Sequence, residues 1–232
     1  MALTVTVSHP PSLFTKVYLD VMSMPLAGEK QWLVSCRDDL SGVTECKAIA
    51  RDKAKVIARF FLKKIILCYG IVQEVVTDNG PSFSKEFSEL LEKYGIHHIR
   101  ISPYNSQANG VVECGHYNIR EALVKLCKGD LSKWPLYVNA ANYADRIAVC
   151  KATGYSPYYL LHGVHPLLPG DLADATFLVS KFKPGMTTHE LIQTRARQLL
   201  RLPKDIAKAR RILQKSRFRS KEAYEKKFAM RL

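Results

Sequence analysis

The order of short apolar segments and amphipathic segments constrains the fold of this chain more than any other feature. Apolar, β-branched runs at residues 17–22, 31–36 and 43–49 are separated by short polar loops, a pattern that predicts an antiparallel meander of three strands. Two more strands are predicted at 71–77 and 97–102, each after an amphipathic helix. This order predicts an α/β domain with a mixed five-stranded sheet flanked by helices.

The helices are predicted from apolar residues that recur at helical spacing. Asp52 and Ser132 are the predicted N-caps of the first and last of them, Gly70 follows the end of the first, and Gly95 follows the end of the second. The predicted helices cover residues 52–68, residues 84–94, a segment that ends near Cys127, and residues 132–149.

A stretch marked by Pro and Gly separates this part of the chain from its end. Thr187 and Glu190 have the spacing of a capping box, which opens a helix, and Pro203 is expected to break that helix. We therefore divide the chain into a core at 10–165, a linker at 166–186 and a basic helical C-terminal extension at 187–232.

Positive charge is concentrated in the extension. Residues 181–232 carry 16 Lys or Arg and 4 Asp or Glu, a net charge of +12, whereas residues 1–180 carry only +2. Such a segment indicates a polyanionic partner, with nucleic acid first. The alternative is a solvated helix that is basic for solubility.

Membrane insertion and secretion are not indicated. No apolar run reaches membrane-spanning length, and the N-terminus lacks the pattern of a signal peptide. The six cysteines form no CxxC pair and no zinc-finger spacing with histidine, so we interpret them as reduced core thiols. We expect a soluble intracellular protein without a membrane partner.

Three acidic residues are prominent by their placement. Asp20 lies inside an apolar strand, where a carboxylate is costly to bury without a partner. Asp78 ends a strand, which is where ligand sites collect in α/β sheets, although it could be only a turn residue in Asp-Asn-Gly. Glu113 begins a helix, where it could simply stabilise the helix N-terminus. Helical spacing puts His116, Tyr117 and Arg120 on the same polar face as Glu113.

The sequence segments around these carboxylates resemble those of a known protein family. VTDNGPSF at 76–83 and ISPYNSQANGVVE at 101–113 are similar to the signature of retroviral and Ty3/gypsy-like retrotransposon integrase cores. TGYSPYYLLHG at 153–163 and HPLLPGDL at 165–172 resemble the stretch that follows that core.

The resemblance implies an RNase H-like fold and a D,D,E polynucleotidyl transferase. Asp20, Asp78 and Glu113 match the family's catalytic and metal-binding carboxylates. The positions that match family contacts to DNA are Tyr104, Asn105, Gln107, Asn109, His116, Tyr117 and Arg120. The resemblance also implies element-end and target DNA as partners, with RNA as the other nucleic acid, a homo-oligomer, and location in the nucleus.

The sequence departs from the family pattern in three ways. Asp78 and Glu113 are separated by 34 residues, one fewer than usual, and Glu113 is followed by Cys114 and Gly115, where many relatives have Arg and Ser. The family's N-terminal zinc domain and its C-terminal domain have no counterpart here, so we interpret the chain as a core with trailing helices, or as a partial element.

The expected chemistry is strand transfer with two Mg²⁺ or Mn²⁺ ions, which oxygen ligands suit. Two alternatives stay open: a catalytically inactive, element-derived nucleic-acid-binding protein, and an RNase H-like nuclease that cuts without joining. The intact carboxylates favour an enzyme, and the loop at 103–110 favours an integrase over a nuclease.

Overall fold

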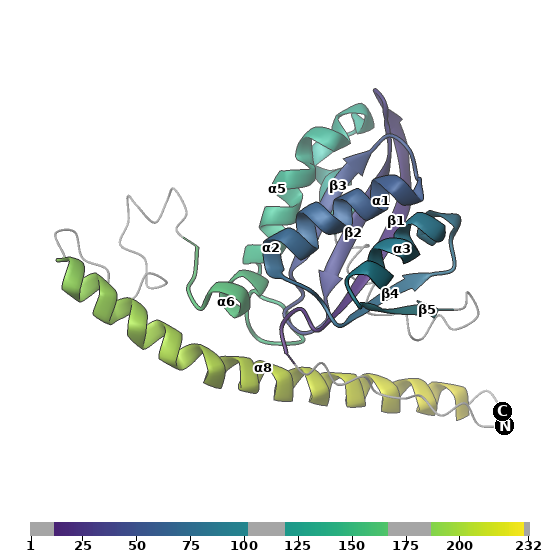
Figure 1. The fold of residues 1–232 in the computed structure, drawn as a ribbon. Coiled ribbons are helices and arrows are strands. Elements are labelled where there is room, and N and C mark those ends of the chain that lie inside the picture. The colour runs from purple at the N-terminus through teal and green to yellow at the C-terminus, as the bar shows by residue number, and fades with distance from the viewer. Residues whose placement is uncertain (1–11, 102–118, 167–186, 230–232) are drawn as a thin grey trace. The chain divides into compact units, whose positions relative to one another are not determined.

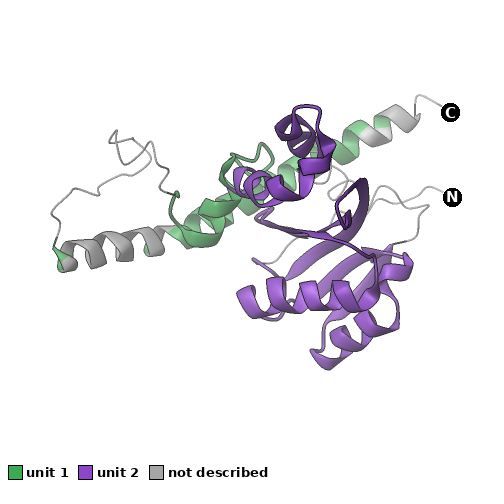
Figure 2. Ribbon diagram, turned by 90° about the horizontal axis from the view of Figure 1, so that it is seen from above, with its two compact units in different colours: residues 1–9, 147–232 green, residues 10–146 purple. Residues whose placement is uncertain are grey.

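The computed structural model describes residues 12–101, 119–166 and 187–229. The chain forms two compact units, one of residues 10–146 and one of residues 1–9 with 147–232 (Figure 2). The predicted boundary of the core after residue 165 stays a prediction.

The larger unit is built on the predicted mixed five-stranded sheet, in the order β3-β2-β1-β4-β5 (Figure 1). β1 pairs with β2 and β2 with β3 in antiparallel fashion, while β4 is parallel to both β1 and β5. The strands are β1 (Lys16–Ala27), β2 (Lys30–Asp38), β3 (Thr44–Ile49), β4 (Glu74–Asp78) and β5 (His97–Ile101).

One face of the sheet is covered by the helices that follow β3 and β4. Phe87 of α3 makes edge-to-face ring contacts with Phe61 of α1 and with His98 of β5, so both helices belong to the face that carries His98. The helical elements here are α1 (Ala54–Phe61), the π-helical turn η1 (Leu62–Ile66), α2 (Leu67–Tyr69), the 3₁₀ turn η2 (Pro81–Phe83) and α3 (Lys85–Lys93).

The other face is covered by a helix at residues 119–127 and by α5 (Trp134–Ile147), which follows the 3₁₀ turn η3 (Leu131–Lys133). Met24, Leu33, Ile119, Leu123 and Trp134 share one buried cluster, which joins β1 and β2 to these helices. The sheet therefore lies between two helical layers, as Figure 2 shows from above.

Two predicted N-caps are wrong. α1 begins after Lys53, and no side chain caps it, so Asp52 does not have the predicted role. The turn that leads into α5 is capped by Asp130, whose carboxylate accepts from the backbone N–H of Ser132 at 3.2 Å. Asp130 was missed because it lies two residues before the predicted cap. Gly70 and Gly95 follow α2 and α3 with positive φ, as predicted.

The second unit contains α6 (Pro157–His162) and α8 (Thr188–Ala229). The hydroxyl of Tyr159 donates to the buried carboxylate of Asp205 at 2.6 Å, which ties α6 to α8. The helix begins directly after Thr187, but it does not break at Pro203, and Figure 1 shows it as one continuous, curved helix. Packing holds both sides of this proline, because Leu202 lies against Gly163 and Asp205 binds Tyr159.

Three of the five described cysteines, Cys36, Cys46 and Cys127, are buried, whereas Cys68 is exposed and Cys150 is half-buried. Burial raises the pKa of the Cys36 and Cys46 thiols, which keeps them protonated. Within the described ranges, no helix combines the length and hydropathy that a bilayer crossing requires.

Candidate active site

Asp20 and Asp78 lie on adjacent parallel strands and point to the same face of the sheet. Tyr18 of β1 is opposite Val76 of β4 at the last registered pair. Each aspartate lies two residues further along its own strand, and side chains alternate along a strand with a period of two. Asp20 and Asp78 therefore share the face that carries Tyr18, Val76 and Ile101, which form one hydrophobic cluster.

Asp20 interrupts an otherwise apolar row on this face. Tyr18 precedes it in one cluster, and Met22 and Met24 follow it in the cluster with helix 119–127. The half-buried carboxylate accepts a hydrogen bond from the backbone N–H of Val21 at 2.8 Å. A charged group at this point of a strand has no capping role, so its placement supports a ligand-binding role.

Asp78 is the last residue of β4, and the turn after it fixes its carboxylate. The backbone N–H of Gly80 donates to Oδ1 of Asp78 at 3.0 Å. A Cβ at position 80 would lie 3.0 Å from the same oxygen, so a larger residue there would shift the carboxylate by a few tenths of an ångström. The Asp-Asn-Gly turn is therefore present, but its geometry also positions Asp78.

An open cavity of about 240 Å³ lies beside Asp78. Its lining combines this carboxylate with Arg100, whose guanidinium donates to Oγ of Ser88 at 2.8 Å. Sequence reasoning missed Arg100, and the signal that could have found it is a lone cation next to the end of β5, the strand that pairs with β4. The complete lining is Asp78, Asn79, Gly80, Pro81, Phe83, Ser84 and Arg100.

Most of the other predicted site residues lie outside the described residues. Arg120 is exposed on helix 119–127 and lines a small cavity with Met24 and Pro25, at the far end of β1 from Tyr18. The structure thus places Arg120 on the helix that covers the carboxylate face. The residues that fall outside are Tyr104, Asn105, Gln107, Asn109, Glu113, His116 and Tyr117.

The described part of the site fits a hard divalent cation through its donor chemistry. Two carboxylates from adjacent strands face the same side, and carboxylate oxygens are the ligands that Mg²⁺ and Mn²⁺ prefer. Among the described residues, no group of three or more His, Cys, Asp and Glu could hold a metal ion. Glu113 is not among those residues, so the described part of the predicted triad is the aspartate pair.

Comparison with known proteins gives similar sequences and folds. Residues 13–106 match the family described as Integrase core domain. The Pol polyprotein of Radiation murine leukemia virus (strain Kaplan) is 30% identical over 162 residues, which are 69% of this chain and 28% of the polyprotein. The Gag-Pol polyprotein of Feline leukemia virus is 32% identical over 138 residues, 59% of this chain and 8% of that protein. The chain thus spans less than a third of these relatives.

Solved structures share the fold. The HTLV-2 integrase catalytic core domain, in complex with magnesium in a trimeric form, superposes with a TM-score of 0.54 at 22% identity, covering 64% of this chain and 96% of that one. The catalytic core domain of BIV integrase gives a TM-score of 0.53 at 24% identity, covering 63% and 92%. Residues 13–106 of this chain are therefore similar to the integrase core domain family, and the chain shares the fold of these retroviral integrase cores.

Proposed function

We propose that this chain is the catalytic core of a retrotransposon-type integrase that joins element DNA to target DNA by metal-dependent strand transfer. The observation that carries the proposal is the strand register, which puts Asp20 and Asp78 on one face of the sheet. The match of residues 13–106 to the integrase core domain family and the magnesium complex of the HTLV-2 core support it. The nucleus is the expected location, since that is where target DNA lies.

In this proposal Asp20, Asp78 and Glu113 hold two Mg²⁺ or Mn²⁺ ions. When bound, such ions neutralise phosphate charge and stabilise the attacking and leaving oxygens of an in-line displacement. The protein residues act by position. The Val21 and Gly80 amides orient the two aspartates. Rigid strands keep them on one side of the sheet.

DNA contacts are proposed for the residues that match the family's contact positions. Arg120 can approach a phosphate, because its side chain is exposed on the helix that covers the carboxylate face. The other proposed contacts are Tyr104, Asn105, Gln107, Asn109, His116 and Tyr117. A homo-oligomer is proposed as well, because strand transfer needs two DNA ends held together.

The test is an oligonucleotide strand-transfer assay with Mg²⁺ or Mn²⁺. Asp20→Asn and Asp78→Asn each remove one ligand charge with almost no change in volume, so we expect both to abolish joined products without loss of folding. Glu92→Gln, an exposed carboxylate on α3, is the matched control and should retain activity. Mg²⁺ should also raise the melting temperature of the wild type more than that of Asp78→Asn.

Each other outcome has a defined meaning. Joined products that persist in Asp20→Asn would show that the first-strand carboxylate is wrongly assigned. Cut but unjoined DNA would indicate a nuclease. DNA binding without any product and without a Mg²⁺ effect on melting would indicate an inactive nucleic-acid-binding relative.

A further inference from the structure

The outer side of α1 carries a row of cations that the proposed active site does not use. Arg51, Lys55, Arg59 and Lys63 recur every fourth residue from the segment before α1 into η1, and all four side chains are exposed. We name these four residues the basic stripe. Lys53 and Lys64, also exposed, flank it.

In the part of the chain that the structure describes, the stripe residues are not held by ion pairs. The ion pairs within 4.0 Å there involve other cations. The helix dipole disfavours Lys55 in the first turn of α1 and favours Arg59 and Lys63 in the last turns of α1 and η1, so it does not account for the stripe as a whole. The charge is therefore available to an external anion.

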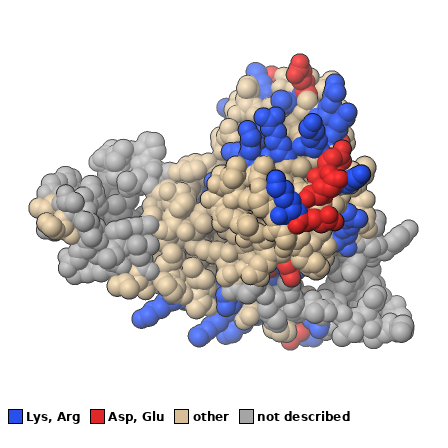
Figure 3. Space-filling view, in the orientation of Figure 1, with Lys and Arg blue, Asp and Glu red and all other residues tan. Residues whose placement is uncertain are grey.

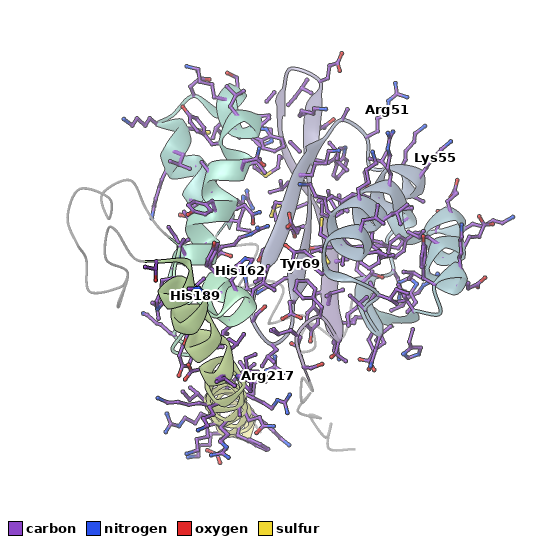
Figure 4. The ribbon with its side chains drawn as sticks, turned by 60° about the vertical axis from the view of Figure 1, so that its left-hand side comes forward. Arg51, Lys55, Tyr69, His162, His189 and Arg217 are labelled. Atoms are coloured by element: carbon purple, nitrogen blue, oxygen red, sulfur yellow. The ribbon has the colours of Figure 1, made fainter. Side chains whose placement is uncertain are left out.

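The spacing of the stripe fits a polymer of negative charges. Four residues advance an α-helix by about 6 Å, so Lys55 and Lys63 are separated by about 12 Å along the helix. Figure 4 shows Arg51 and Lys55 at the same end of α1, pointing away from the strands. In Figure 3, Lys and Arg gather mainly at the top of the view, beside a smaller group of Asp and Glu.

The stripe is also separate from the carboxylates. α1 and α3 cover the sheet face that carries His98, whereas Asp20 and Asp78 point to the opposite face, which helix 119–127 covers. A nucleic-acid segment on the stripe is thus a different segment from the one at the carboxylates.

We propose that the basic stripe binds the phosphate backbone of a nucleic-acid duplex, as a second contact surface on the integrase core unit. Exposed Arg and Lys neutralise phosphates without reading bases, so the contact is independent of sequence. It holds a second part of the DNA, or a second duplex, while another segment lies at the carboxylates. The surface works without metal and without the D,D,E carboxylates.

The experiment measures duplex affinity of the full chain in EDTA over a series of salt concentrations. The test variant carries Arg51→Gln, Lys55→Gln, Arg59→Gln and Lys63→Gln. The control variant also loses four positive charges, but from scattered exposed positions. It carries Lys47→Gln, Lys93→Gln, Lys128→Gln and Lys151→Gln. Circular dichroism and melting establish that both variants fold. Should the quadruple variant fail to fold, R51Q/K55Q and R59Q/K63Q are measured as separate pairs.

A phosphate contact adds about 0.9 to the slope of log affinity against log salt, so we expect the stripe variant to lower the slope by about two to four units. The control should leave it nearly unchanged, because its charges are dispersed. A DNA duplex and an RNA duplex of the same sequence are the two probes, and a loss with either supports the proposal and identifies the nucleic acid. Equal slopes for the stripe variant and the control with both probes would overturn it, whatever the strand-transfer assay shows.

Discussion

The protein holds the His98 side chain in its neutral form. One ring nitrogen lies 2.8 Å from the hydroxyl of Thr77, and the ring meets Phe87 edge to face. Burial, then the charges of Arg100 and His97, lower the pKa of His98 from 6.5 to about 4. His98 belongs to the α3 face of the sheet, so this histidine is structural rather than catalytic.

The lowered pKa makes folding depend on pH in a defined direction. The unfolded chain takes up a proton on His98 near pH 6.5, whereas the folded protein does so only near pH 4. His98 therefore does not affect stability above pH 6.5, and it destabilises the fold progressively as the pH falls from 6.5 towards 4. The free energy of unfolding of His98→Gln, measured with urea, should fall less over this window than that of the wild type. His97→Gln, at the exposed neighbour, should keep most of the wild-type slope, because burial and Arg100 lower the pKa of His98 more than His97 does.

The two described carboxylates show how much of the site could be predicted from individual residues of the sequence. Asp20 was recognisable because a mid-strand aspartate has no local role, and Asp78 because a turn follows its strand. Their common face depends on the register of β1 against β4, which arises from pairing between segments far apart in the chain. Arg100 escaped prediction for the same reason, since only the fold brings it beside Asp78.

Between elements, a buried polar group joins β3, α2 and α5. The guanidinium of Arg146 lies 2.6 Å from the carboxylate of Glu45 and also donates to the carbonyl of Thr44 at 3.0 and 3.1 Å. Tyr69 donates its hydroxyl to the same carboxylate at 2.6 Å, and its own pKa is raised by burial and by this bond. The last turn of α5 is thereby anchored to the edge strand of the sheet.

Removing one partner of this pair should be costly. Arg146→Met leaves Glu45 largely buried without its cation, and we expect a loss of about 3 kcal/mol in the free energy of unfolding. Adding Glu45→Gln should recover part of that loss, because no unpaired charge then remains. Lys85→Ala, from an exposed pair on α3, should change stability by less than about 0.5 kcal/mol. Additive losses in the double variant would contradict a direct pairing of Arg146 with Glu45.

Helical periodicity predicted which helices exist better than it predicted their details. The π turn at Leu62–Ile66 inserts an extra residue, so Cys68 turns to solvent instead of continuing the buried face. α6 was missed, although Ser156 followed by Pro157 is a local start signal and the Ser156 hydroxyl accepts from the N–H of Tyr159. Pro203 does not end α8 because contacts on both sides outweigh the loss of one backbone hydrogen bond.

At the scale of the whole molecule, the long helix α8 carries its buried side chains on one side and its exposed cations on the other. Asp205, Ala209 and Leu213 are buried at helical spacing. Lys204, Lys208, Arg211 and Lys215 are exposed on the other side. Truncation of the helix would therefore remove the partner of α6 together with the charge, whereas substitution of the four exposed cations removes the charge alone.

We expect Lys204→Gln, Lys208→Gln, Arg211→Gln and Lys215→Gln together to weaken metal-free DNA binding in a salt-dependent way. Each lost phosphate contact lowers the slope of log affinity against log salt by about 0.9, so the four changes should lower it by up to about 3.6 units. Melting should be unaffected, because the buried row of α8 is intact. Asp78→Asn should do the opposite: without metal its carboxylate repels phosphate, so the variant should bind DNA equally or slightly more tightly while strand transfer is lost.

These two results separate the binding function of α8 from the chemistry of the core. An active integrase should lose affinity in the α8 variant and turnover in Asp78→Asn, whereas an inactive DNA-binding relative has only affinity to lose. If the α8 variant keeps the wild-type salt slope, the concentration of charge near the C-terminus is a solvated face. The phosphate contacts must then come from the core unit, and the basic stripe on α1 and the neighbourhood of Arg120 become the surfaces that account for them.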